Sequence, residues 1–165
     1  MRWPWVVSVA LAAACAHGGG APEGGTPSHN QAAVATPKDV VAAARSAIER
    51  WREAYEVKSV EGLTELYAHD PDTVVVLEGQ PLIGWSSVEA ALKDRLARAD
   101  AIHVTLKDIQ IASLAPTVAH LTATLTREVQ AGATTVTEHG TVTVVMEKRG
   151  DAWLIVAEHY SYKHA

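Results

Sequence analysis

Four polar residues near the ends of three expected strands have side chains that could act on a small molecule. Residues 153–162, WLIVAEHYSY, alternate as in a strand, and one face of this stretch ends in His159 and Ser161. Glu138 and Arg127 lie in the two preceding expected strands. A carboxylate can orient an imidazole as a general base, and a guanidinium can hold a carboxylate or enolate oxygen. The pattern therefore predicts Glu138 and His159 as catalytic residues and Arg127 and Ser161 as ligand-binding residues.

The same four residues also fit a purely structural arrangement. Arg127 and Glu138 would form a diagonal ion pair, and His159 would share a hydrogen bond with Ser161. Many cross-strand charge pairs have no other role, so the sequence leaves both interpretations open.

The expected strand pairing brings these residues to one end of one sheet face. Four long strands are expected from residue 102 onward, with turns at 115–116, 131–132 and 149–150. Two-residue turns would place Leu125 opposite Glu138 and Gly140 opposite His159, with Gly140 leaving room beside the imidazole. The opposite face is rich in Thr and Tyr and suits a homodimer contact. A slip of one residue would exchange the two faces.

Helices are expected before these strands. Thr36 and Pro37 open the first helix as N-cap and first helical residue, and its apolar stripe extends to Tyr55. Ser59 caps a shorter helix, and residues 86–89 form a capping box for a third. A short β-hairpin, built on residues 73–77 and 82–83, separates the second helix from the third.

The first residues resemble an export signal. A short positive start is followed by an apolar stretch and small residues before Cys15, the chain's single cysteine. The stretch LAAAC resembles a bacterial lipobox, which predicts a signal peptide at 1–14 and lipidation of Cys15. Residues 15–36 are rich in Gly, Pro and Ala and are expected to be a flexible tether. We expect an exported protein anchored by lipid, in the outer membrane facing the periplasm, or else a soluble secreted protein.

The remainder of the chain, 37–165, resembles the nuclear transport factor 2-like superfamily and, within it, the SnoaL-like branch. The resemblance rests on the order of elements, on Gly84-Trp85 before the third helix, and on the stretch 153–161. It implies an α+β fold in which three N-terminal helices pack on a curved, mostly antiparallel sheet to form a cone. Further ligand-binding residues expected to line the cone are Trp51, Tyr55, Tyr67 and Trp153.

Isomerases of this superfamily carry a base Asp late in the first strand and a Tyr in the first helix. Val76 or Leu77, and Trp51, stand in those places here. Isomerase chemistry by that set of residues is therefore not expected.

The composition limits the classes of partner and cofactor that this chain is expected to bind. The net charge of −5 and the absence of a basic run with aromatics argue against nucleic acid. The histidines show no metal-ligand spacing, and no phosphate loop or nucleophile motif is present, so neither a metal nor a cofactor is expected. Three hypotheses remain: a tethered domain that binds a small apolar or carboxylate-bearing molecule, a dehydratase, isomerase or cyclase, and a protein-association module.

Overall fold

Helix α1 (Pro37–Glu56) begins where the sequence caps it. The computed structural model describes residues 34–77 and 79–162 of the 165-residue chain. The Thr36 hydroxyl accepts a hydrogen bond from Asp39 N at 3.3 Å, and the Asp39 carboxylate accepts one from Thr36 N at 3.0 Å. This capping box confirms the expected helix start. The predicted signal peptide, Cys15 and most of the predicted tether lie outside the described residues.

Two shorter helices follow. Helix α2 (Val60–Thr64) begins after Ser59, as expected. Helix α3 (Trp85–Arg98) follows its N-cap Gly84 and has no side-chain cap, so the predicted capping box with Ser86 as N-cap is wrong, and the helix begins two residues earlier. The physical reason is the backbone of Gly84, which has φ +82° and where a Cβ would lie 3.2 Å from the Pro71 carbonyl oxygen.

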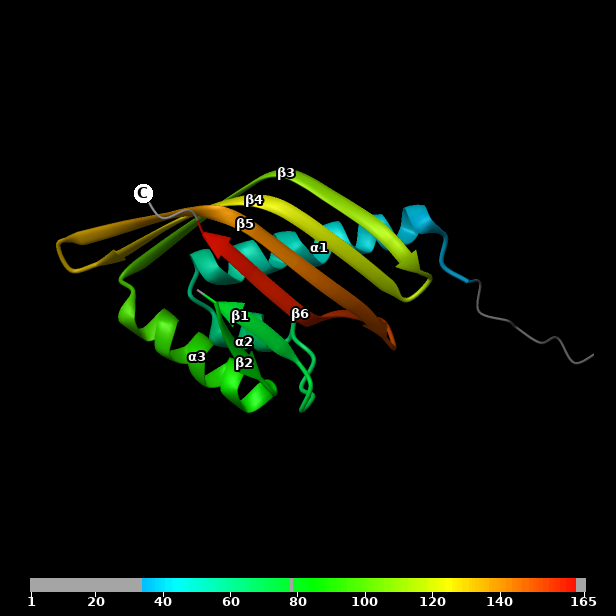
Figure 1. Cartoon of the computed structure of the whole chain (residues 1–165), viewed down its shortest axis with the longest axis horizontal. Helices are drawn as coiled ribbons and strands as arrows, with labels where there is room; N and C mark the ends of the chain where they lie inside the picture. Colours follow the sequence, from blue (N-terminus) through cyan, green and yellow to red (C-terminus); the bar gives the residue numbers. More distant parts are fainter. Residues whose placement is uncertain (1–33, 78, 163–165) are drawn as a thin grey trace, which may run out of the picture. The chain divides into compact units, whose positions relative to one another are not determined.

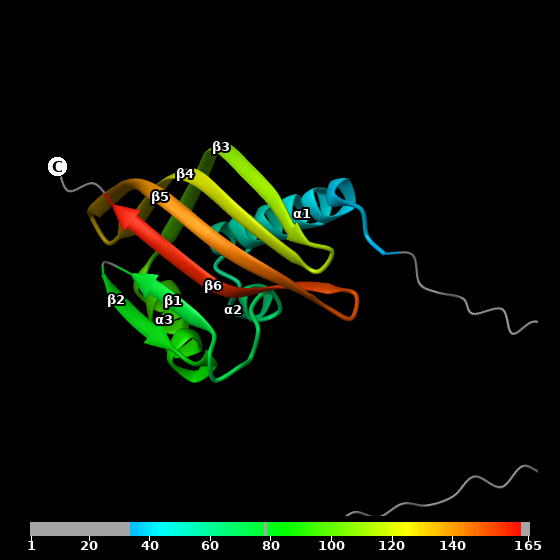
Figure 2. The same ribbon diagram turned by 45° about the vertical axis from the view of Figure 1, so that its right-hand side comes forward.

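Six strands in the described residues form one mostly antiparallel sheet. The strands are β1 (Val74–Leu77), β2 (Gln80–Ile83), β3 (Ala101–Ala115), β4 (Val118–Ala131), β5 (Thr134–Arg149) and β6 (Ala152–Tyr162). Their order in the sheet is β2-β1-β6-β5-β4-β3, and only β1 and β6 run parallel. The long strands bend across α1, whereas α3 packs against the small β1–β2 hairpin (Figures 1 and 2).

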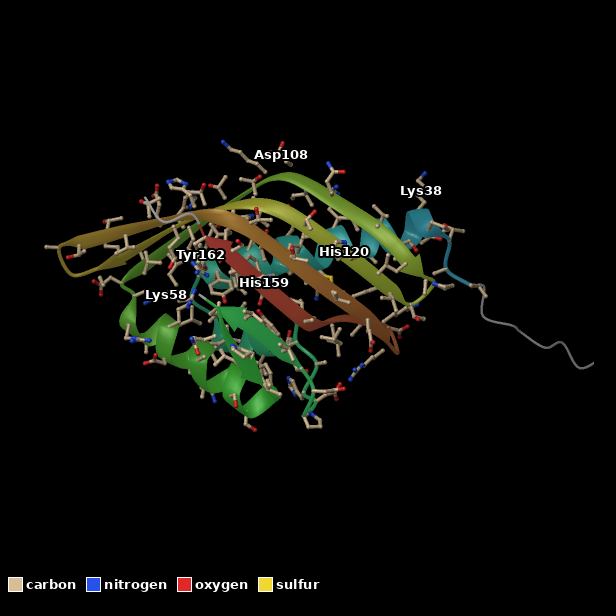
Figure 3. The ribbon with its side chains drawn as sticks, viewed as in Figure 1. Lys38, Lys58, Asp108, His120, His159 and Tyr162 are labelled. Atoms are coloured by element: carbon tan, nitrogen blue, oxygen red, sulfur yellow. The ribbon has the colours of Figure 1, made fainter. Side chains whose placement is uncertain are left out.

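The bend of β3 has a local cause. Its pairing with β4 shifts between Lys107 and Gln110, and Asp108 has a positive φ of 51°. Figure 3 labels Asp108 at this bend. A bulge of this kind lets a long strand turn over the helix beneath it.

Strands β4 and β5 pair two residues away from the expected register. Ala131 pairs with Thr134, so the turn is Gly132-Ala133, and Arg127 lies directly opposite Glu138. A shift of two residues keeps every side chain on its expected face. The prediction that Arg127 and Glu138 share the helix-covered face is therefore confirmed, with a direct rather than a diagonal pairing.

Strand β6 departs from the expected pattern halfway along its length. Met146 pairs with Ile155, but Val145 pairs with Ala157, so Val156 is skipped as a bulge. Side chains after the bulge exchange faces, because a strand alternates with period two. The expected β5–β6 register is therefore wrong by two residues before the bulge, because the turn is Gly150-Asp151, and by three residues after it.

The core lies between α1, α3 and the covered face of the sheet. Val142, Val144 and Met146 of β5 are completely buried there. They pack with the buried stripe of α1: Val40, Ala44, Ala47, Ile48, Trp51, Ala54 and Tyr55. Among the described residues, none of the helices is both long enough and apolar enough to cross a membrane.

The predicted α+β class and mostly antiparallel sheet are confirmed. The order of the helices is also as expected, but the packing of all three on the sheet is not clearly confirmed, because α2 contacts mainly α1 and α3. The second helix has only five residues, and the third follows the first hairpin and contacts β1 and β2.

Candidate functional site

Arg127 and Glu138 form a buried ion pair on the covered face of the sheet. Arg127 Nε donates to Glu138 Oε2 at 2.6 Å, and Nη2 lies 2.5 Å from the same oxygen. The Arg127 side chain is completely buried, while that of Glu138 retains 21% exposure. Nη2 also donates to the hydroxyl of Tyr162. The Arg127–Glu138 ion pair, which the sequence predicts, is therefore extended by a hydrogen bond to Tyr162.

His159 and Ser161 lie on the opposite, uncovered face. Both are exposed, and their cross-strand partners are Thr143 and Thr141. Figure 3 labels His159 on β6, with Tyr162 at the C-terminal end of that strand. The prediction that His159 and Ser161 gather with Glu138 on one face is wrong, because the β6 bulge exchanges the faces. The geometry that supported His159 as a base oriented by Glu138 is absent.

The bulge places Glu158 in the interior instead. The residue is 2% exposed, and its carboxylate accepts hydrogen bonds from the hydroxyl of Tyr67 and, at 2.6 Å, from that of Tyr160. Trp51 Nε1 donates in turn to the Tyr67 hydroxyl at 3.1 Å. A chain of hydrogen bonds therefore runs from helix α1 through the segment before β1 to strand β6.

We call the buried group formed by Trp51, Tyr55, Tyr67, Arg127, Glu158 and Tyr160 the interior cluster. The Trp51 ring meets Tyr55 edge-on with ring centroids 4.7 Å apart, and it stacks on Tyr160 at 6.4 Å. Trp153, predicted beside them, is also buried in the core. These aromatic residues therefore lie in the interior as expected, and a ligand-binding role for them stays a prediction.

Burial has the largest effect on the pKa values of the interior carboxyl and phenol groups. Burial raises the pKa of the Glu158 carboxyl, although the hydrogen bonds from Tyr160 and Tyr67 and the charge of Arg127 oppose the rise. Burial raises the pKa of Tyr162 to about 12, against the opposing charge of Arg127. Burial also disfavours the charged form of Arg127, but the surrounding tyrosines outweigh this and raise its pKa. Arg127 is therefore a permanent buried cation.

One nitrogen of this cation lacks a hydrogen-bond acceptor. Arg127 Nη1 is buried and has no hydrogen-bond partner among the described residues. The guanidinium carbon lies 5.2 Å from the Tyr160 ring centroid, 5.6 Å from that of Tyr162 and 6.0 Å from that of Tyr55. These rings attract the charge through their π faces, but they supply no lone pair to a directed N–H donor. Nη1 therefore keeps a hydrogen-bond donor for one further oxygen acceptor.

A small cavity lies beside the interior cluster. Its volume is about 10 Å³, and it opens between α1, the β1–β2 hairpin and α3. Its lining residues are Tyr55, Val75, Leu77, Leu82, Val88, Ala91, Leu92 and Arg95. Tyr55 thus contacts both the cavity and the guanidinium of Arg127. Within the described ranges, no cluster of three or more His, Cys, Asp or Glu side chains could hold a metal ion.

Comparison with known families now identifies the domain. A family model described as the SnoaL-like domain matches residues 44–164. The chain belongs to the SnoaL-like domain family. No curated protein matches the chain.

Solved structures of this SnoaL-like domain's fold include proteins named for different roles. A proposed dehydratase of the NTF2-like family from Streptomyces avermitilis has a TM-score of 0.72 at 20% identity, covering 78% of this chain and 100% of that one. A proposed scytalone dehydratase from Novosphingobium aromaticivorans has a TM-score of 0.68 at 12% identity, covering 74% and 83%. An NTF2-like superfamily protein from Salmonella enterica has a TM-score of 0.67 at 16% identity, covering 78% and 91%. At these identities the likeness establishes the NTF2-like fold alone.

The sequence did not single out Glu158, Tyr160, Tyr162 or Arg95 as site residues. One signal was available for the residues on β6. In a chain without Phe, two tyrosines at the end of a core strand have more apolar surface to bury than a histidine and a serine. This preference favours burial of the face that carries Tyr160 and Tyr162.

Replacing Glu158 by Gln should change how stability depends on pH. Because the folded-state pKa of Glu158 is raised, its stabilising contribution is complete below about pH 4.5 and is lost as pH rises through the raised value. Gln does not titrate. We therefore expect the unfolding free energy of the wild type minus that of Glu158→Gln to fall with rising pH.

Urea unfolding between pH 4 and 8 measures this difference. Glu128→Gln, which removes an exposed carboxyl from the uncovered face of β4, is the matched control. A difference for Glu158→Gln that rises with pH would contradict the raised pKa.

Proposed function

We propose that this SnoaL-like domain binds a small molecule through a carboxylate or enolate oxygen that accepts a hydrogen bond from Arg127 Nη1. The unpartnered, buried Nη1 is the observation that carries the proposal. Native structures leave few buried donors unpaired, because each costs about 1–3 kcal/mol. A ligand oxygen would satisfy this donor and neutralise a cation that the protein already holds in place.

The surroundings of Arg127 support binding rather than a passive ion pair. The Glu138 carboxylate contacts Nε and Nη2, so one edge of the guanidinium is held rigidly. The third nitrogen, Nη1, remains without a partner among the described residues. Three tyrosine rings around the charge exclude water, and exclusion of water strengthens a charge-assisted hydrogen bond. A site of fixed donors among aromatic side chains is typical of small-molecule recognition.

Isothermal titration with sodium acetate tests the proposal. We expect saturable binding by the wild type and at least about tenfold weaker binding by Arg127→Met, because a charge-assisted hydrogen bond is lost. Arg98→Met, on the exposed surface of α3, is the matched control and should bind acetate as the wild type does. Unchanged binding by a folded Arg127→Met variant would contradict the proposal.

Catalysis is the second candidate, and Glu158 is the specific observation that favours it. A buried carboxyl whose pKa is raised by burial can exchange a proton with a bound molecule, and Tyr67 and Tyr160 fix its orientation. In this alternative Glu158 takes the role that the sequence assigned to His159, and the reaction belongs to the dehydratase, isomerase or cyclase type. Loss of turnover in Glu158→Gln with retained ligand binding would distinguish catalysis from binding alone.

The uncovered face of the sheet is proposed as a homodimer contact. Thr122 lies opposite Thr143 and Thr124 opposite Thr141, so the middle of β4 and β5 presents four short, uncharged polar side chains. Native mass spectrometry of protein purified from its host would report the dimer and any retained small molecule together. A monomer mass at all concentrations would contradict the contact.

Membrane attachment is proposed through a lipid on Cys15, from the LAAAC stretch. We expect Cys15→Ser to move the protein from the membrane fraction to the soluble fraction of its host. Fractionation followed by immunoblotting measures this shift. A distribution identical to that of the wild type would contradict lipidation at Cys15.

A further inference from the structure

The buried carboxylate of Glu158 lies close to the cation to which the proposed ligand would bind. The Tyr160 hydroxyl donates to Glu158 Oε1 at 2.6 Å, and the ring of the same tyrosine lies 5.2 Å from the guanidinium carbon of Arg127. One aromatic side chain therefore connects the carboxylate with the cation. Each of these three residues is at most 2% exposed, so little solvent screens a charge that is added beside them.

The charged groups in this part of the interior are already balanced when Glu158 is ionised. Among the described residues, Arg127 and Arg95 are the two cations that act on Glu158. The second carboxylate is that of Glu138, which is paired with Arg127 at 2.5 Å. Two carboxylates therefore stand against two guanidinium groups. A bound carboxylate would add one unbalanced negative charge, and such a charge is costly to bury.

Glu158 is the group that can remove this extra charge by taking up a proton. Burial raises the pKa of its carboxyl, although the hydrogen bonds from Tyr160 and Tyr67 oppose the rise. A further carboxylate nearby would act in the same direction as burial, because like charges disfavour ionisation. Burial also raises the pKa values of the Tyr67 and Tyr160 phenols well above the usual range, so both keep their protons.

The groups that face Glu158 come from every layer around it. The titratable and charged side chains that act on its carboxyl are Tyr55 of α1, Tyr67 before β1, Arg95 of α3, Arg127 of β4 and Tyr160 of β6. The tyrosines and arginines keep their protons at neutral pH. Glu158 is therefore the one member of this set whose protonation can follow the arrival of an anion.

The hydrogen bonds around Glu158 fit both of its protonation states. The ionised carboxylate accepts a hydrogen bond from each of two hydroxyls, those of Tyr67 and Tyr160. A hydroxyl oxygen has acceptor lone pairs as well as a donor, so either hydroxyl can rotate and accept the proton of a neutral Glu158. Uptake of a proton therefore requires no rearrangement of the side chains.

We infer that a carboxylate binds at Arg127 together with one proton, which Glu158 takes up, so that the interior receives no net charge. This inference rests on the proposed function. It adds the proton that accompanies the ligand, and it makes Glu158 the residue that sets the pH range of binding. Free Glu158 loses its proton as pH rises through its pKa, so binding above that pH requires proton uptake and weakens by up to about tenfold per pH unit.

Isothermal titration with sodium acetate between pH 6 and 8.5 tests the inference. Titrations at pH 7.5 in MOPS and in Tris, whose ionisation enthalpies differ, give the number of protons taken up per acetate. We expect the wild type to take up protons and its affinity to fall as pH rises. Glu158→Gln should take up no proton, and its affinity should be independent of pH and higher than that of the wild type at pH 8.5.

Two other variants complete the test. Tyr67→Phe removes a hydrogen bond to the ionised carboxyl and should move the fall in affinity toward higher pH. This variant keeps Glu158, so it tests the inference even if Glu158→Gln fails to fold. Glu128→Gln, which removes an exposed carboxyl from the uncovered face of β4, is the matched control and should retain wild-type proton uptake. Melting temperatures show whether each variant folds.

The outcomes separate this inference from the proposed function. Acetate binding by the wild type without proton uptake would overturn the inference and leave carboxylate binding at Arg127 standing. Equal proton uptake by the wild type and Glu158→Gln would assign the proton to another group and would also overturn it, as would an unchanged pH dependence in Tyr67→Phe. No acetate binding by the wild type at any pH in this range would overturn the proposed function together with this inference.

Discussion

Arg127→Ala is expected to lower the free energy of unfolding by about 3–5 kcal/mol. The substitution removes a fully buried side chain and leaves Glu138 and Tyr162 without their shared partner. It also removes the cation that lies against three tyrosine rings. Urea unfolding monitored by circular dichroism at pH 7 measures the loss.

A size-matched variant separates the causes of this loss. Arg127→Met fills most of the volume and should lose less than Arg127→Ala, because it leaves a smaller cavity. Arg98→Ala removes an exposed arginine and should change stability by less than about 0.5 kcal/mol. A loss for Arg127→Ala as small as that for Arg98→Ala would mean that the ion pair is not buried as described.

Gly140→Ala is expected to destabilise the fold by about 3 kcal/mol. An added Cβ at Gly140 would lie 2.1 Å from the carbonyl oxygen of Ser161, so β5 and β6 would have to separate at the end of their pairing. The backbone oxygen cannot rotate away as a side chain could. Displacement of Tyr162 would follow, since it pairs with Gly140 across the two strands.

Gly132→Ala is the matched control for this substitution. Gly132 is in the β4–β5 turn, where a Cβ would meet nothing within 4 Å, and only its positive φ of 59° opposes a side chain. We expect a loss of about 1 kcal/mol there. An equal loss at the two glycines would contradict the close approach of Ser161. The sequence-based expectation that Gly140 leaves room for His159 is wrong, because the glycine accommodates backbone.

Local rules were sufficient for much of this fold. Thr36 and Asp39 identified the start of α1, and period-two alternation placed the side chains of β4 and β5 on their observed faces. The prediction for β4 and β5 held although the expected turn was wrong. The pairing register was off by two residues, and an even shift keeps each side chain on its face. The order of elements and the residues around Gly84-Trp85 then indicated the family that the comparison confirms.

The candidate site was harder to predict, because one bulge in β6 determines which side chains of that strand are buried. Nothing in the alternation of β6 marks Val156 as the skipped residue, since both faces are apolar at that point. Apart from the preference of the two tyrosines for burial, tertiary packing decides between burial of His159 with Ser161 and burial of Glu158 with Tyr160. The distant hydroxyl of Tyr67, which donates to Glu158, contributes to this choice, and no local pattern connects the two residues.

A high-resolution crystal structure of the protein grown in sodium acetate tests the central claim most directly. Our account predicts an acetate oxygen at about 3 Å from Arg127 Nη1. It is contradicted if Nη1 donates to a carbonyl oxygen of the protein and no anion lies beside the guanidinium.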